Sequence, residues 1–224
     1  MATVTGRTLD DSGDPIPGTG FEYDADGPLG NLLDRRVGPL NSHPTRPTWS
    51  APLERSEDGP GRLRVLSIFG PGYDGPPEHY HEVSEESFEV RRGELTLDCD
   101  GRERSVGAGE TATVPTGTRH SFRCTGDDLT VVLTTIAPLG RIGYVLPTLG
   151  GIAHDSEVDA DDPLQRALIA KRLEGDTVFT ETESPLVGAA TDLLAPLAKL
   201  RGYQGGYGRY RQPAFWERHV EQPD

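Results

Sequence analysis

The sequence predicts a mostly β protein, a barrel or sandwich of short strands followed by a helical C-terminal extension. Of 224 residues, 28 are Gly and 19 are Pro, and only 34% are hydrophobic; this composition is typical of turn-rich β structure. Between residues 46 and 137, strand-length segments of alternating polarity are separated by turns that contain Gly, Pro or Asp. Closely spaced short strands of this kind indicate a sandwich or barrel.

The regions on either side of these strands differ in composition. Residues 1–45 are rich in Asp, Gly and Pro and have few apolar positions, which predicts a loosely ordered acidic N-terminal arm. Residues 46–137 hold the strands of the barrel. Residues 138–224 shift to helical patterning and predict a helical extension with a Gly- and Tyr-rich tail.

Two helix starts stand out in the extension. Asp162 and Pro163 form an N-cap and first-turn pair ahead of an apolar-periodic segment, and Gly175 lies just beyond its end. Ser184 and Pro185 open a second helix in the same way. Its apolar residues are spaced alternately four and three apart, which predicts packing against the barrel or against a second subunit; they are Leu186, Ala190, Leu193, Leu197 and Leu200.

The charge balance is strongly acidic, with 36 acidic residues against 22 basic ones and a net charge of −14. Such a surface repels nucleic acid and anionic lipid, so neither is expected as a partner. We interpret the acid excess as adaptation to high salt, where a Debye length of roughly 3 Å screens repulsion between carboxylates. This predicts an origin in a halophilic archaeon; the alternative is a GC-rich genome that favours Arg codons.

The sequence contains no apolar stretch of about 18 residues, so no transmembrane helix is expected. The first residues lack the basic and apolar regions of a signal peptide, which predicts a cytoplasmic location. Cys99 and Cys124 are the only two cysteines, too few for a disulfide framework, and free thiols are expected.

Three histidines lie on strand faces that point into the predicted barrel. His79 and His81 are two residues apart on one short strand, so both side chains lie on the same face. His120 opens a later strand whose same-face residues are Phe122 and Cys124. The remaining three histidines fall in loops or tails and are taken as ordinary surface or core residues.

One carboxylate shares this inward direction. Counting along the strand from Glu86, the same-face residues are Phe88 and Val90; counting from Glu85, they are polar. A ligand that points into an apolar barrel belongs to the first set, so Glu86 is the predicted fourth ligand.

Three imidazoles and one carboxylate suit one divalent transition metal, either Fe, Mn, Ni, Cu or Zn. Such a site keeps one or two coordination positions for water, O2 or substrate. The sequence does not discriminate among these metals.

The spacing of these residues resembles the cupin superfamily of double-stranded β-helix, or jelly-roll, barrels. The first cupin motif matches His79, His81, Glu86 and Gly93, and the second matches Gly109, Pro115, Gly117 and His120. Two positions depart from the pattern: Tyr73 replaces an upstream Gly, and Cys124 replaces an Asn that ends the second motif. The resemblance covers residues 60–136 and implies a single-domain, microbial type of cupin.

The resemblance implies a metal-dependent dioxygenase similar to the quercetinase-type cupins, acting on a small organic or aromatic molecule. In such an enzyme Glu86 acts as the catalytic base. Two alternatives remain open: a redox-neutral isomerase, and a binding or sensor protein without turnover. A homodimer is also expected. The substrate pocket is predicted to be lined by inward-facing side chains, namely Phe88, Val90, Phe122, Cys124, Leu97 and Leu133.

Overall fold

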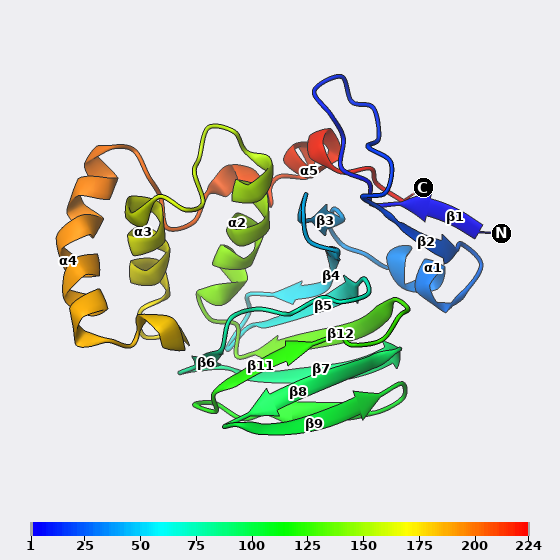
Figure 1. The fold of residues 1–224 in the computed structure, drawn as a ribbon, viewed down its shortest axis with the longest axis horizontal. Helices are drawn as coiled ribbons and strands as arrows, with labels where there is room; N and C mark the ends of the chain where they lie inside the picture. Colours follow the sequence, from blue (N-terminus) through cyan, green and yellow to red (C-terminus); the bar gives the residue numbers. More distant parts are fainter. Residues whose placement is uncertain (1, 224) are drawn as a thin grey trace.

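The computed structural model describes residues 2–223, and in it two antiparallel sheets face each other below a set of helices (Figure 1). The larger sheet has the strand order β10-β7-β12-β5-β4-β3, and the smaller has the order β13-β6-β11-β8-β9. A two-stranded ribbon, β1-β2, lies at the N-terminal side. This confirms the predicted fold class, a mostly β barrel with C-terminal helices.

The strands are β1 (Ala2–Thr5), β2 (Phe21–Asp24), β3 (Asn41–Ser42), β4 (Thr48–Ser56), β5 (Arg62–Phe69), β6 (His79–His81), β7 (Glu85–Arg92), β8 (Glu94–Cys99), β9 (Arg102–Gly107), β10 (Thr111–Val114), β11 (His120–Arg123), β12 (Thr130–Ala137) and β13 (Thr177–Phe179). The helices are α1 (Pro28–Leu33), α2 (Ile142–His154), α3 (Pro163–Leu173), α4 (Pro185–Leu200) and α5 (Pro213–His219), with short 3-10 turns η1 (Thr180–Thr182) and η2 (Gly208–Arg211).

The barrel core lies between the two sheets. Along β7 the buried residues are Glu86, Phe88 and Val90, whereas Glu85 is exposed. The alternation that predicted Glu86 as the inward carboxylate is therefore present in the structure. The core cluster also takes buried apolar side chains from β5, β8, β9, β10 and β12, namely Phe69, Leu95, Leu97, Val106, Ala112, Val114 and Val132.

The N-terminal segment is packed, and the prediction of a loosely ordered arm over residues 1–45 is wrong for the described part of it. Its apolar side chains are few, but they gather in one cluster on the outer face of the larger sheet. Trp49 of β4 belongs to it: its ring is tilted against that of Phe21, and its Nε1 donates a 2.8 Å hydrogen bond to the Gly6 carbonyl. Composition alone underestimated this segment because a few well-placed side chains are enough to cover one sheet face.

The two ends of the chain pair with each other (Figure 1). Thr8 forms an antiparallel bridge with Val220, and the Arg7 guanidinium makes an ion pair with Glu221, 214 residues away. The side-chain amide of Gln222 both donates to the Leu40 carbonyl and accepts from its N–H. The C-terminal residues thus fasten the N-terminal segment in place.

Two helices of the extension, α3 and α4, begin where the sequence predicts, whereas α2 and α5 were not predicted. Asp162 caps α3 by accepting a 2.8 Å bond from the Leu164 N–H, and Pro185 opens α4. The predicted packing of the α4 leucines on the barrel is wrong, because the face that packs on α3 contains the small residues Ala195 and Ala198. Within residues 2–223, no helix has the length and apolarity that a bilayer span requires.

We expect Leu33→Ala to lower the free energy of unfolding by about 2–5 kcal/mol, because it opens a cavity under the N-terminal segment. Leu33 is 1% exposed. Val37, which is 64% exposed, provides the matched control, and Val37→Ala is expected to change stability by no more than about 0.5 kcal/mol. Urea unfolding measures both; equal effects would mean that the segment does not belong to the cooperative fold.

Candidate metal centre

The structure brings the four predicted ligands together at one end of the barrel core. His79 and His81 lie on β6, and His120 opens the neighbouring β11, directly paired with His79. Glu86 reaches the same point from β7 in the facing sheet. One ligand atom from each residue lies within 4.8 Å of all the others, and all four residues are buried.

Each imidazole is held by a hydrogen bond at Nδ1. The Nδ1–H of His79 donates to the Pro77 carbonyl at 2.9 Å, and that of His120 donates to the Thr118 carbonyl at 3.0 Å. A carbonyl oxygen only accepts, so Nδ1 carries the proton in both rings. In the neutral ring, Nε2 is then left with a lone pair that is free for another partner.

His81 is held differently. Its Nδ1 lies 2.9 Å from the hydroxyl oxygen of Thr177, and that hydroxyl donates its own proton to Asp176 at 3.0 Å. The Thr177 oxygen must therefore accept from His81, which again places the proton on Nδ1.

The Nε2 atoms of His81 and His120 lie 3.2 and 3.0 Å from the same carboxylate oxygen, Oε2 of Glu86. If both rings were neutral, two lone pairs would face a carboxylate oxygen with nothing positive between them, in a buried site where repulsion is weakly screened. This arrangement needs a cation, either a proton or a metal ion. The donor set of imidazole nitrogens and a carboxylate, with no thiolate, fits a borderline divalent transition metal.

The pKa values describe the metal-free cluster. Burial lowers the pKa of His79 to about 4. Burial also disfavours the cation of His120, but the hydrogen bond and charge of Glu86 outweigh it and raise the pKa of His120. For Glu86, burial acts to raise the pKa, yet His120 and His81 hold it well below its usual range. Without metal, the pair His120–Glu86 therefore retains a proton that a metal ion would displace.

Most of the predicted pocket residues lie in the barrel interior, but they pack against one another. Phe88, Val90, Leu97 and Cys124 are all buried in one cluster, and Phe122 packs at its edge. Both cysteines are free thiols, as predicted. Burial raises the pKa of Cys124 to about 11, which makes this thiol a poor nucleophile.

Leu133 does not line this interior, and that prediction is wrong. It lies on the opposite face of β12, in the cluster covered by the N-terminal segment, while its neighbour Val132 points inward. Strand β12 is buried on both faces, so its sequence lacks the polar alternation that reveals the inward side.

The sequence analysis missed the contribution of β13. This strand pairs with β6, with Thr177 opposite His81 and Phe179 opposite His79, and the Phe179 ring lies 5.8 Å from the His79 ring. A three-residue strand among helices, 40 residues after the barrel, leaves no periodic signal in the sequence.

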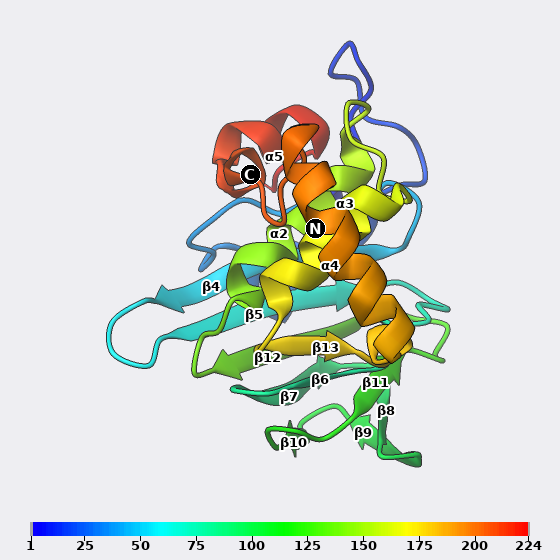
Figure 2. The ribbon, with the colours of Figure 1, turned by 90° about the vertical axis from the view of Figure 1, so that its left-hand side faces the viewer.

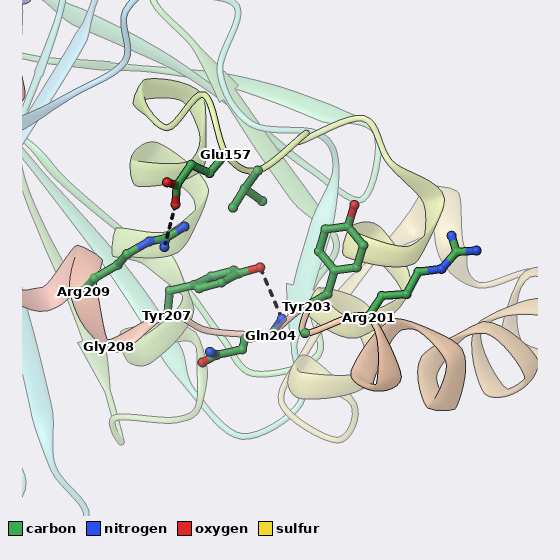
Figure 3. Close-up of a pocket in the computed structure, with 9 residues that line it drawn as sticks. Glu157, Arg201, Tyr203, Gln204, Tyr207, Gly208 and Arg209 are labelled. Atoms are coloured by element: carbon green, nitrogen blue, oxygen red, sulfur yellow. Dashed lines mark hydrogen bonds and ion pairs between the residues drawn. The ribbon is translucent and has the colours of Figure 1, made fainter. Parts of the chain in front are cut away.

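A surface hollow of about 630 Å³ lies elsewhere, among the C-terminal helices (Figure 3). Several of its polar side chains are already paired: Tyr203 donates to Asp162, Tyr207 donates to Gln165, and Arg209 makes ion pairs with Asp155 and Glu157. None of the four clustered ligands lines it, so we place the chemistry at the buried cluster instead.

Comparison with known proteins agrees with the two motifs. A family model described as "Cupin domain" matches residues 65–137. This segment is therefore similar to a cupin domain. It contains all four clustered side chains, while the N-terminal segment and the helical extension lie outside the match.

Three curated relatives each match part of the chain. Polyketide synthase CurC of Streptomyces cyaneus is 33% identical over 97 residues, which is 43% of this chain and 60% of the relative. Quercetin 2,3-dioxygenase of Bacillus subtilis is 38% identical over 63 residues, which is 28% of this chain and 19% of the relative. Protein SchB of Streptomyces halstedii is 37% identical over 71 residues, which is 30% of this chain and 51% of the relative. The chain thus spans less than two thirds of each of these relatives.

Solved structures are also similar. KdgF from Halomonas sp. is 21% identical with a TM-score of 0.38, covering 42% of this chain and 81% of KdgF. TT1209 from Thermus thermophilus is 22% identical with a TM-score of 0.38, covering 51% of this chain and 98% of TT1209.

Proposed function

We propose that the protein binds one divalent transition metal through His79, His81, Glu86 and His120 and uses it as a dioxygenase of small aromatic or enolic compounds. The observation that carries the metal site is the arrangement of the Nδ1 bonds. They leave Nε2 of His81 and of His120 facing the Glu86 carboxylate, with His79 in the same cluster, and a divalent cation would satisfy this arrangement in place of a proton. Support for the substrate class comes from the similarity to quercetin 2,3-dioxygenase and to a protein named for polyketide synthesis.

A bound Fe, Mn, Ni or Cu ion would supply Lewis acidity and redox chemistry at this point. The role of Glu86 follows from its position: it is the one carboxylate in the cluster and is buried. As a general base it would accept the proton of a substrate hydroxyl.

A second candidate is a metal-binding or sensor protein without turnover. The packing of the predicted pocket favours it, because Phe88, Val90 and Leu97 are 0–3% exposed and fill the space next to the cluster. A flavonol-sized substrate would have to displace these side chains or bind at the rim near Tyr73 and Phe122, which are only partly buried.

We expect wild-type protein to bind one equivalent of Co²⁺ and the His79→Ala/His81→Ala double variant to bind none. Glu86→Gln is expected to weaken binding less than loss of the histidine pair, since all three imidazoles remain. Glu85→Gln is the matched control, because Glu85 is exposed on the opposite strand face. Elemental analysis and chelator competition measure the metal content and affinity of all four proteins; equal metal content in wild type and double variant would contradict the assignment.

Saturating metal should also stabilise the fold, by about 4 kcal/mol at a thousandfold excess over Kd.

We expect metal-loaded protein to consume O2 in the presence of quercetin, the flavonol used as probe. Glu86→Gln should lose this activity by at least about a hundredfold, the size of a typical general-base contribution, even in preparations that retain full metal. Oxygen uptake with Fe, Mn, Ni and Cu loaded separately tests this. Full metal occupancy without turnover on quercetin and a panel of smaller enols would favour the binding protein over the dioxygenase.

A further inference from the structure

We propose that the helical extension completes the metal centre, with Thr177 as the positioning residue for His81. The proposal rests on the proposed metal site. It concerns residues outside the matched cupin domain, which ends at residue 137.

The extension reaches the centre as a strand of the barrel itself. Strand β13 adds to the edge of the smaller sheet beside β6, which places Thr177 directly opposite His81. In Figure 2, β13 runs alongside the sheets below α3 and α4. The following turn is fastened to the same edge, because the Thr180 N–H donates to the Glu78 carbonyl at 3.0 Å.

The three imidazoles are not held in the same way. His79 and His120 each bond a carbonyl two residues earlier in their own loops, so their orientation is local. His81 has no such carbonyl at Nδ1 and instead bonds a hydroxyl 96 residues away in sequence. Its orientation alone, among the three, depends on the extension.

Thr177 is itself fixed by a buried acid. Its hydroxyl donates to Asp176 Oδ1, and the Asp176 carboxylate accepts the backbone N–H groups of Arg141 at 2.6 Å and Ile142 at 2.9 Å. Asp176 and Thr177 are 2% and 3% exposed. The close approach requires a glycine at position 140, where a Cβ would lie 1.8 Å from Asp176 Oδ2.

This connection gives the hydroxyl a direction. Because its proton is committed to Asp176, the Thr177 oxygen presents a lone pair to His81 and holds the tautomer with Nδ1 protonated and Nε2 toward Glu86. Hydrogen bonds of this kind orient a ligating imidazole and raise its basicity, and their loss typically weakens metal binding by about 10–100-fold.

The test compares Co²⁺ affinity by chelator competition in wild type, Thr177→Val, Thr177→Ser and Thr182→Val. Thr177→Val keeps the shape and loses the hydroxyl, so we expect affinity to fall by about 10–100-fold. Thr177→Ser restores the hydroxyl and should recover most of it. Thr182→Val is the matched control, since the Thr182 hydroxyl bonds only the Phe179 carbonyl. The visible absorption of bound Co²⁺ should change in Thr177→Val alone.

Unchanged affinity and absorption in Thr177→Val would overturn the positioning role and leave the metal site standing. Failure of wild type itself to bind Co²⁺ would overturn the proposed metal site and this inference with it. Equal loss in the valine and serine variants would indicate general damage to β13 and would likewise overturn the role of the hydroxyl.

A separate observation concerns the outer face of α4. Three leucines spaced seven residues apart are almost fully open: Leu186 is 82%, Leu193 77% and Leu200 86% exposed. Leu197 adds to the same stripe at 42%. In Figure 1, α4 is the outermost helix, with α3 beside it, and in Figure 2, which is seen from that side, α4 lies in front.

The character of this stripe indicates a second copy of the chain as its occupant. The four-three spacing is that of a two-helix seam, which packs against another seam of the same spacing. Although the chain carries a net charge of −14, α4 contains only Asp192 and Lys199, and Asp192 is paired with Lys171 of α3 at 2.8 Å. Two acidic copies can therefore meet here without bringing like charges together.

We infer that two copies pair through α4 about a two-fold axis. Covering the stripe on both copies would bury on the order of 1,000 Å², near the lower limit for a specific interface. High salt should strengthen the pairing, because it screens the repulsion between the two acidic bodies.

Light scattering on the full chain in low and high salt tests this. We expect wild type to be a dimer whose dissociation constant falls at high salt, and Leu193→Glu to be a monomer. The control Val37→Glu adds the same charge at an exposed valine far from α4 in sequence and should remain a dimer. A monomeric wild type at all concentrations, or a dimer that survives Leu193→Glu, would overturn the interface. Binding of monomers to neutral phosphatidylcholine vesicles, lost in Leu193→Glu, would assign the stripe to lipid instead.

Discussion

The hydrogen bonds at the three Nδ1 atoms are the interactions on which the candidate centre depends. Each bond places a proton on Nδ1, and in His81 and His120 it leaves Nε2 directed at Glu86. Without these bonds the rings could rotate, and the cluster would be an ordinary set of buried polar groups that satisfy one another. With them, the site is arranged for a cation before any cation arrives, so binding does not have to order the ligands first.

The barrel and its four converging side chains could be predicted because their signals are local. His79, His81 and His120 lie on short strands whose faces follow from alternation, and Phe88 and Val90 identify Glu86 over Glu85. The helix starts at Asp162 and Ser184 could likewise be predicted, because each is a polar N-cap residue followed by a proline.

What the sequence could not supply are the contacts between distant segments. The sequence predicts the wrong face for Leu133 because β12 is apolar on both sides. Both sides are apolar because the N-terminal segment covers the outer one. Thr177 and Asp176 carry no pattern that connects them to His81. Both errors have one physical cause. A local pattern can indicate that a residue is buried, but it does not identify the distant segment of the chain that buries it.

The pairing of the two chain ends has a consequence for how the protein is made. Arg7 pairs with Glu221, 214 residues later, so neither this contact nor the bridge of Thr8 to Val220 can form until the barrel strands have been synthesised. Until then the N-terminal segment lacks its fastening, and the outer face of β5, with Leu66 and Ile68, is covered by a segment that can open. Contacts of such long sequence separation form slowly. The nascent barrel is thus exposed to aggregation through this face until these partners have been added.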